Sequence, residues 1–128
     1  MCHRHFAWNR FLTDHAFVID AEDVAFSLVE VGALRVDPSG EIVRVAILRE
    51  GRLRMLSVPR VCRPSPGNGY VHVVVRAPNG RRHVVKGHRL VWRALRGRIP
   101  AGSHVRHRNR QRGDNRLENL DLIRYHHE

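Results

Sequence analysis

The chain has 128 residues, of which 42% are hydrophobic, and a formal net charge of +11. This length and apolar content suffice for one compact unit with a modest core. No apolar run is long enough to span a bilayer, and residues 1–20 carry charges where a signal peptide would have an apolar block. We therefore expect a cytoplasmic protein with no membrane partner, and its two cysteines form neither a disulfide framework nor a metal knuckle.

The positive charge is concentrated in the second half of the chain. Residues 1–60 hold eight arginines and eight acidic residues, whereas residues 61–128 hold fourteen arginines and Lys86 against four acidic residues. The second half thus carries the whole net charge, which predicts a surface that binds a polyanion. The preference for arginine suits bidentate phosphate contacts, although a GC-rich genome would produce the same bias.

The first third of the chain has a helical pattern, and residues 1–32 are expected to form helices in two pieces. Asp20 is expected to cap the second piece, in which apolar residues recur at i, i+4 and i+7 from Val24 until Gly32 ends the helix. We expect these helices to pack against the rest of the domain.

From Ala33 the pattern changes to that of antiparallel strands. The expected strands are residues 34–36, 42–48 and 53–58, followed by a hairpin of residues 70–75 and 81–86. Turns at 37–40 and 77–80 would join them. A Pro- and Gly-rich connection at 63–69 suggests a division into a helical and β-hairpin region, 1–65, and a C-terminal module, 66–128.

The C-terminal part has the residues of a phosphodiester-cutting site. A helix is expected at 88–96, then two short strands, 105–108 and 120–123, joined by a polar loop, 109–119. Hydrolysis of a phosphodiester needs a base, a cation and donors that hold the phosphate. His107 has a proton affinity suited to a base near pH 7. It could instead only donate to phosphate, and asparagines of the loop could be ordinary turn residues.

Four stretches carry a longer motif: HRLVW at 88–92, RIPAG at 98–102, VRHRN at 105–109 and DNRLENL at 114–120. Together they resemble the HNH endonucleases of phages and mobile introns. The resemblance implies an α+β protein: N-terminal helices, small antiparallel sheets or hairpins, and a C-terminal ββα-metal module whose final helix is cut short here. It also implies an enzyme that nicks or cleaves double-stranded DNA, in the host cytosol if a phage encodes it. RNA is a possible second partner.

The resemblance also assigns roles to residues of the loop. His107 matches the general base, Asn119 matches the asparagine that braces the loop and orients that histidine, and Asn115 matches the second loop asparagine. His88 and Trp92 match structural positions. The family usually holds one divalent ion, Mg²⁺ or another, between a residue just before the base and one on the following helix.

This chain departs from the motif at the metal positions. Arg106 precedes His107, and a guanidinium cannot ligate a cation, although some members of the family also have V-R-H here. Glu128 falls at the second position and offers a carboxylate, which suits Mg²⁺. Arg110 replaces the usual turn glycine. The candidate ligands are therefore Glu128, Asn109 and Asp114, with His126 and His127 as further substitutes.

Arginines of the helix and the loop are the expected nucleic-acid contacts. They should bind phosphates rather than bases, with an affinity that falls steeply with salt. They are Arg89, Arg93, Arg106, Arg108, Arg110, Arg112 and Arg116.

Two alternatives to a nuclease stay open on the sequence. One is a catalytically lapsed HNH derivative that binds nucleic acid or inhibits a host machine, and the departures at the metal positions favour it. The other, a basic ribosome-associated protein, depends on charge alone. Binding without metal-dependent cutting would favour the first alternative, and the oligomeric state cannot be read from the sequence.

Overall fold

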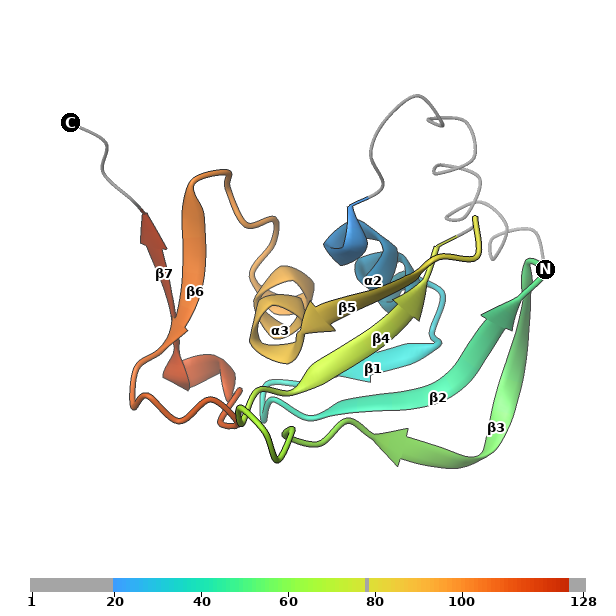
Figure 1. Cartoon of the computed structure of the whole chain (residues 1–128), viewed down its shortest axis with the longest axis horizontal. Helices are drawn as coiled ribbons and strands as arrows, with labels where there is room; N and C mark the ends of the chain where they lie inside the picture. Colours follow the sequence, from blue (N-terminus) through green and yellow to red (C-terminus); the bar gives the residue numbers. More distant parts are fainter. Residues whose placement is uncertain (1–19, 78, 125–128) are drawn as a thin grey trace.

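The computed structural model describes residues 20–77 and 79–124, so the expected first helix, Glu128, His126 and His127 lie outside the described residues. It has α2 (Ala21–Glu30), β1 (Leu34–Val36), β2 (Ile42–Arg49), β3 (Arg52–Val61), β4 (His72–Arg76), β5 (Arg82–Lys86), α3 (Gly87–Leu95), β6 (Ser103–His107), the short 3₁₀ helix η1 (Leu117–Asn119) and β7 (Leu120–Arg124) (Figure 1). The predicted α+β class is confirmed. Within the described part of the chain, no helix is long and apolar enough to cross a membrane.

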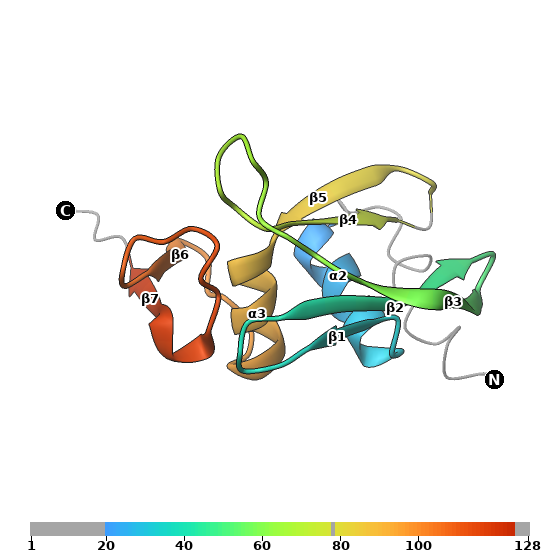
Figure 2. The same cartoon turned by 90° about the horizontal axis from the view of Figure 1, so that it is seen from below.

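The strands form three separate antiparallel groups. β1, β2 and β3 make a three-stranded sheet in that order, and β4–β5 and β6–β7 are two-stranded hairpins. Seen from below, α2 and α3 lie between the β4–β5 hairpin and the sheet (Figure 2). The β6–β7 hairpin stands beyond α3, at one end of the long axis (Figure 1).

Helix α2 begins and ends where its sequence predicts. The side chain of Asp20 accepts a hydrogen bond from the backbone N–H of Glu22 at 2.8 Å, which satisfies one of the free donors of the first turn. Gly32, at φ +86°, ends the helix in a conformation that favours glycine. The buried face of α2 is the expected apolar stripe, with Val24 fully buried.

The core draws on both halves of the chain. Its most buried apolar side chains come from α2, the sheet, the hairpins and α3: Val24, Leu34, Ile42, Val73, Val75, Leu90 and Val91. Val105 of β6 and Leu120 of β7 extend it toward the C-terminal hairpin. The division into residues 1–65 and 66–128 stays a prediction, but the two parts share one core.

Two arginines of α3, which were expected to face outward, point toward α2 in the structure. Arg89 is bonded to Glu22 through Nε and Nη2, and Nη1 of Arg93 lies 3.0 Å from Oδ1 of Asp23. The guanidinium of Arg93 also lies over the Phe26 ring, 4.5 Å from its centroid. Arg89 and Arg93 were expected to be nucleic-acid contacts, whereas the structure pairs their charges with carboxylates of α2.

Candidate active site

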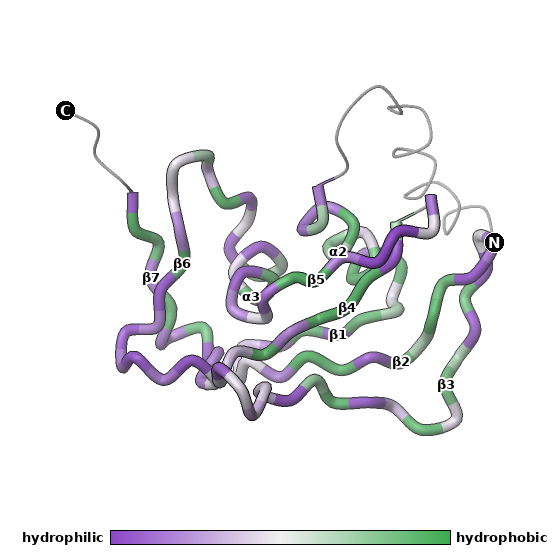
Figure 3. The backbone as a smooth tube through the Cα atoms, in the orientation of Figure 1, coloured by the Kyte–Doolittle hydropathy of each residue, from purple (hydrophilic) through white to green (hydrophobic). Residues whose placement is uncertain are grey.

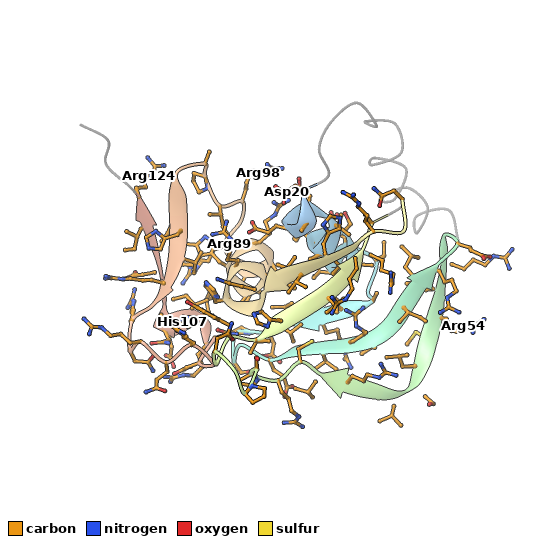
Figure 4. All side chains as sticks on the ribbon, in the orientation of Figure 1. Asp20, Arg54, Arg89, Arg98, His107 and Arg124 are labelled. Carbon is orange, nitrogen blue, oxygen red and sulfur yellow. The ribbon has the colours of Figure 1, made fainter. Side chains whose placement is uncertain are left out.

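The β6–β7 hairpin buries His107. His107 pairs with Leu120 and Arg106 pairs with Asp121 across the ladder. Because side chains alternate along a strand, His107 points to the core side with 8% of its surface exposed, while Arg106 points to solvent. The expected hairpin is confirmed, and His107 is its last strand residue before the loop (Figure 4).

Two aromatic rings, those of His88 and Tyr70, pack against His107. The ring of His88, at the start of α3, lies 4.6 Å from the ring of His107, measured between centroids, and Tyr70 lies 5.6 Å from His88 and 6.3 Å from His107. Burial lowers the pKa of His88 to about 3, with a smaller contribution from the neighbouring His107, while a hydrogen bond to the backbone of Val105 acts in the opposite direction. His88 is therefore a neutral packing partner for His107 at pH 7.

Asn115 fixes the orientation of the His107 ring. Its Oδ1 lies 2.7 Å from Nε2 of His107, and the Asn115 side chain is 3% exposed. With the amide oriented this way, Oδ1 accepts from Nε2–H, so the neutral form of the ring carries its proton on Nε2 and its lone pair on Nδ1. The orienting contact that the resemblance assigned to Asn119 is thus made by Asn115.

Asn119 braces the loop instead. Its Oδ1 accepts from the backbone N–H of Asn109 at 3.1 Å, and its Nδ2 donates to Oδ1 of Asn109 at 3.0 Å and to the backbone carbonyl of Asp114 at 2.9 Å. Its own carbonyl accepts from the backbone N–H of Arg108 at 2.7 Å. Asn119, at 5% exposure, therefore ties both ends of the loop together just beyond His107.

The loop is largely hydrophilic (Figure 3), and several of its arginines are already paired with carboxylates. Arg116 donates to both oxygens of Asp114, at 2.8 and 2.9 Å, and this holds the pKa of Asp114 well below its usual range. Arg106 and Arg108 share Asp121, at 3.5 and 3.0 Å. These exposed pairs leave the guanidinium groups at the surface, where a phosphate could compete for them.

Arg110 and Arg112 are placed differently from the paired arginines. Arg112 lies over the Tyr70 ring, 4.8 Å from its centroid, and donates to the carbonyl of Asn68 at 3.2 Å. Arg110 is exposed, adopts φ +62°, and has no ion pair with any residue of the described ranges. Arg110 is therefore the arginine of this loop most available to a phosphate.

The described residues hold no ready-made site for a divalent metal ion. Among these residues, no group of three His, Cys, Asp or Glu side chains lies close enough to hold one. The carboxylate of Asp114 accepts hydrogen bonds from Arg116 and from Nδ2 of Asn109. Oδ1 of Asn109 accepts from the backbone N–H of Gln111 and from Nδ2 of Asn119. The candidate ligands Asn109 and Asp114 are thus committed to the loop's own hydrogen bonds.

Two features of the surroundings were missed by sequence reasoning. Tyr70, which the sequence indicated only as the first residue of an expected strand, joins the ring cluster, and Nζ of Lys86 lies 4.4 Å from its ring centroid. A hollow of about 340 Å³ between β2, β3 and β4 is lined in part by Arg44, Arg49, Arg60 and Arg76. Summed charge concealed Arg44, Arg49 and Arg60, because the acidic residues of residues 1–60 cancel their charge.

Two comparisons with known proteins found similarity to HNH endonucleases. Residues 85–124 match the family model described as HNH endonuclease. A solved structure described as "DNA binding and cleavage by the HNH homing endonuclease I-HmuI" is similar in fold, with a TM-score of 0.52 and 19% sequence identity over 73% of this chain. The match covers 47% of that chain, so the present chain spans about half its length. No curated protein matches.

The matched family is the one that the sequence motif resembles. Residues 85–124 therefore carry the similarity to HNH endonucleases, and this segment includes His88, His107, Asn115 and Asn119.

Proposed function

We propose that this protein is an HNH endonuclease that binds DNA and nicks or cleaves it by hydrolysing a phosphodiester bond, with His107 as the general base. The observation that carries the proposal is the 2.7 Å contact between Oδ1 of Asn115 and Nε2 of His107. In the neutral ring this contact places the proton on Nε2 and the lone pair on Nδ1, which is the form that a general base requires.

In the proposed reaction Nδ1 of His107 takes a proton from a water molecule while the water oxygen attacks phosphorus. The bond from phosphorus to the leaving oxygen then breaks, and that oxygen takes a proton from solvent. His88 stays neutral beside His107, so it adds no positive charge that would oppose protonation of the base. HNH endonucleases generally use a divalent metal, which would supply charge neutralisation at the phosphate.

Double-stranded DNA is the proposed partner. Five exposed arginines lie at the end of β6 or in the loop that follows it: Arg106, Arg108, Arg110, Arg112 and Arg116. Arginine is well suited to phosphate oxygens. The arginine-lined hollow between β2, β3 and β4 could add contacts outside the C-terminal hairpin. We expect the protein to act in the cytoplasm, where DNA is accessible.

A plasmid-nicking assay tests the proposal. Wild type should convert supercoiled plasmid to the nicked or linear form in Mg²⁺ or Mn²⁺ and not in EDTA. His107→Ala should lose on the order of 10²- to 10⁴-fold in rate, as expected for a general base, while a filter-binding titration shows unchanged DNA affinity. His72→Ala, a half-buried histidine of β4, is the matched control and should keep the wild-type rate.

The second candidate is a catalytically lapsed HNH protein that binds nucleic acid. The pairing of Arg106 with Asp121, at a position where the family usually has a metal ligand, favours it. In that case wild type and His107→Ala would bind DNA equally and neither would cut it with any metal. RNA binding of equal strength would further favour this candidate.

A further inference from the structure

The turn between β1 and β2 packs against the loop that holds Asn115. It is a four-residue turn, Asp37 to Gly40, closed by a 2.9 Å hydrogen bond from the backbone N–H of Gly40 to the carbonyl of Asp37. The carbonyl of Pro38 accepts from the backbone N–H of Leu117 at 2.9 Å. Two segments more than 70 positions apart in the sequence are thus hydrogen-bonded beside the candidate active site (Figure 2).

Gly40 makes the closest approach. A Cβ atom at this position would lie 2.3 Å from the carbonyl carbon of Asn115, 2.5 Å from its oxygen and 2.6 Å from the backbone nitrogen of Arg116. These are backbone atoms, which cannot rotate away as the end of a side chain could. Gly40 also has φ +87°, which other residues adopt at a cost. Its lack of a side chain therefore lets the turn touch the backbone of Asn115 directly.

The side chain of Asn115 is enclosed from another direction. A Cβ atom on Gly87, the first residue of α3, would lie 3.0 Å from Nδ2 of Asn115 and 2.9 Å from Val71. Nδ2 itself has no hydrogen-bond partner among the described residues. Because that amide nitrogen gains no hydrogen bond that would hold it, packing at the backbone and around the side chain orients the amide, together with the bond from Oδ1 to His107.

We infer that the turn Asp37 to Gly40 is a positioning element for His107: by fixing the backbone of Asn115, it directs Oδ1 onto Nε2 and so selects the tautomer of the base. The catalytic consequence rests on the proposed function, but the effect on the His107 ring does not. The N-terminal sheet would then control the chemistry of the HNH module through one glycine contact, in addition to any contact it makes with DNA.

The chain contains a matched control for this contact. Gly80, in the turn between β4 and β5, has φ +85° and donates from its backbone N–H to the carbonyl of Ala77 at 2.9 Å, as Gly40 does to Asp37. A Cβ atom on Gly80 would meet nothing within 4 Å. Gly40→Ala and Gly80→Ala therefore carry similar backbone strain, and they differ in the contact with Asn115.

The test compares the His107 tautomer in the full-length protein, by two-bond ¹H–¹⁵N correlation spectra of the imidazole. Wild type and Gly80→Ala should both show the Nε2–H form, whereas Gly40→Ala should show a mixture. The nicking rate kcat of Gly40→Ala should fall on the order of 10- to 100-fold, as for other residues that orient a functional group, with DNA affinity changed less than twofold. A merely structural turn would lower stability equally in both variants and leave the tautomer and kcat alone.

A second pair of variants keeps the test decisive if Gly40→Ala does not fold. Asp37→Ala removes the side-chain acceptor for the backbone N–H of Ser39, at 3.0 Å, and so loosens the turn without adding atoms. Asn79→Ala removes a contact of the same kind in the other turn, where Oδ1 of Asn79 accepts from the backbone N–H of Arg81 at 2.9 Å. A mixed tautomer in Asp37→Ala but not in Asn79→Ala supports the inference. Wild-type spectra in both overturn it. If no variant or wild type cuts DNA, the proposed function fails and the spectra still decide this question.

Discussion

The rings of His88 and His107 pack 4.6 Å apart, measured between centroids, and burial prevents the first from taking up a proton at neutral pH. The HRLVW histidine, which the motif marks as structural, is thus in direct contact with the candidate base. Its neutrality has a measurable effect on stability.

The stability of the protein should fall as the pH is lowered from about 6.5 toward 3. The pKa of His88 is about 3 in the folded protein, against an ordinary value of about 6.5 in the unfolded chain. Between these values the unfolded state binds a proton that the folded state does not, so this group contributes a loss of at most on the order of 1 kcal/mol per pH unit. His88→Gln, which cannot titrate, should show a shallower fall in urea unfolding between pH 7.5 and 4.5. An identical slope in both proteins would contradict this.

Arg110→Gly should weaken DNA binding without weakening the fold. Arg110 is exposed at φ +62°, a conformation that costs about 1 kcal/mol for a residue other than glycine. Loss of one phosphate contact should reduce the slope of log affinity against log salt by about 1. Filter binding over a salt series and thermal unfolding measure the two effects. Arg89→Ala, which breaks the pairing with Glu22, should do the reverse: lower stability and unchanged binding.

Asn119→Asp should destabilise the loop, although the two side chains have nearly the same shape. The aspartate keeps an acceptor for the backbone of Asn109, but it loses the donor to Oδ1 of Asn109 and to the carbonyl of Asp114. It also places a negatively charged oxygen beside two acceptor oxygens, Oδ1 of Asn109 and the carbonyl of Asp114. The free energy of urea unfolding should therefore fall by about 1–3 kcal/mol. Asn79→Asp is the control, because the contact of Asn79 with Arg81 uses its oxygen alone. Equal stability of the two variants would show that Asn119 does not brace the loop.

Arg106→Asp should create a divalent-ion site that the described residues of the wild type lack. Arg106 pairs with Asp121 across the ladder, so the variant places two carboxylates directly opposite each other. Their repulsion should lower the melting temperature in EDTA, and Mg²⁺ or Mn²⁺ should restore it, because carboxylates are the oxygen ligands that these ions prefer. Mg²⁺-dependent nicking should rise, and His107→Ala in this background should abolish the gain.

The double variant Arg106→Asp/Asp121→Asn separates these effects. It removes one of the two facing carboxylates, so both the repulsion in EDTA and the rescue by metal should largely disappear. Rescue that persists in the double variant would mean that the ion binds elsewhere. A nicking rate below that of wild type in Arg106→Asp would assign Arg106 a role at the phosphate.

Local features of this protein could be read from its sequence because they depend on neighbouring residues. The cap at Asp20, the apolar stripe of α2 and the turns at Gly40 and Gly80 follow from contacts within a few positions and from the period of the apolar residues. Strand bounds shifted modestly: β3 extends to Val61, beyond the expected 58, because pairing with β2 continues past a bulge. The HNH motif also identified the segment that contains His107 and its loop.

Tertiary structure alone decided which side chains meet. From the sequence, Arg89 and Arg93 were expected to contact phosphate, but in the structure they pair with Glu22 and Asp23 of α2. The partner of His107 is Asn115 rather than Asn119. The side chain of Asn119 is hydrogen-bonded to the loop itself, whereas that of Asn115 points inward to the His107 ring. Nothing near Gly40 in the sequence indicates that it touches Asn115. Such contacts join residues that are far apart along the chain, and their geometry is set by the packing of a core shared between both halves, which no local pattern encodes.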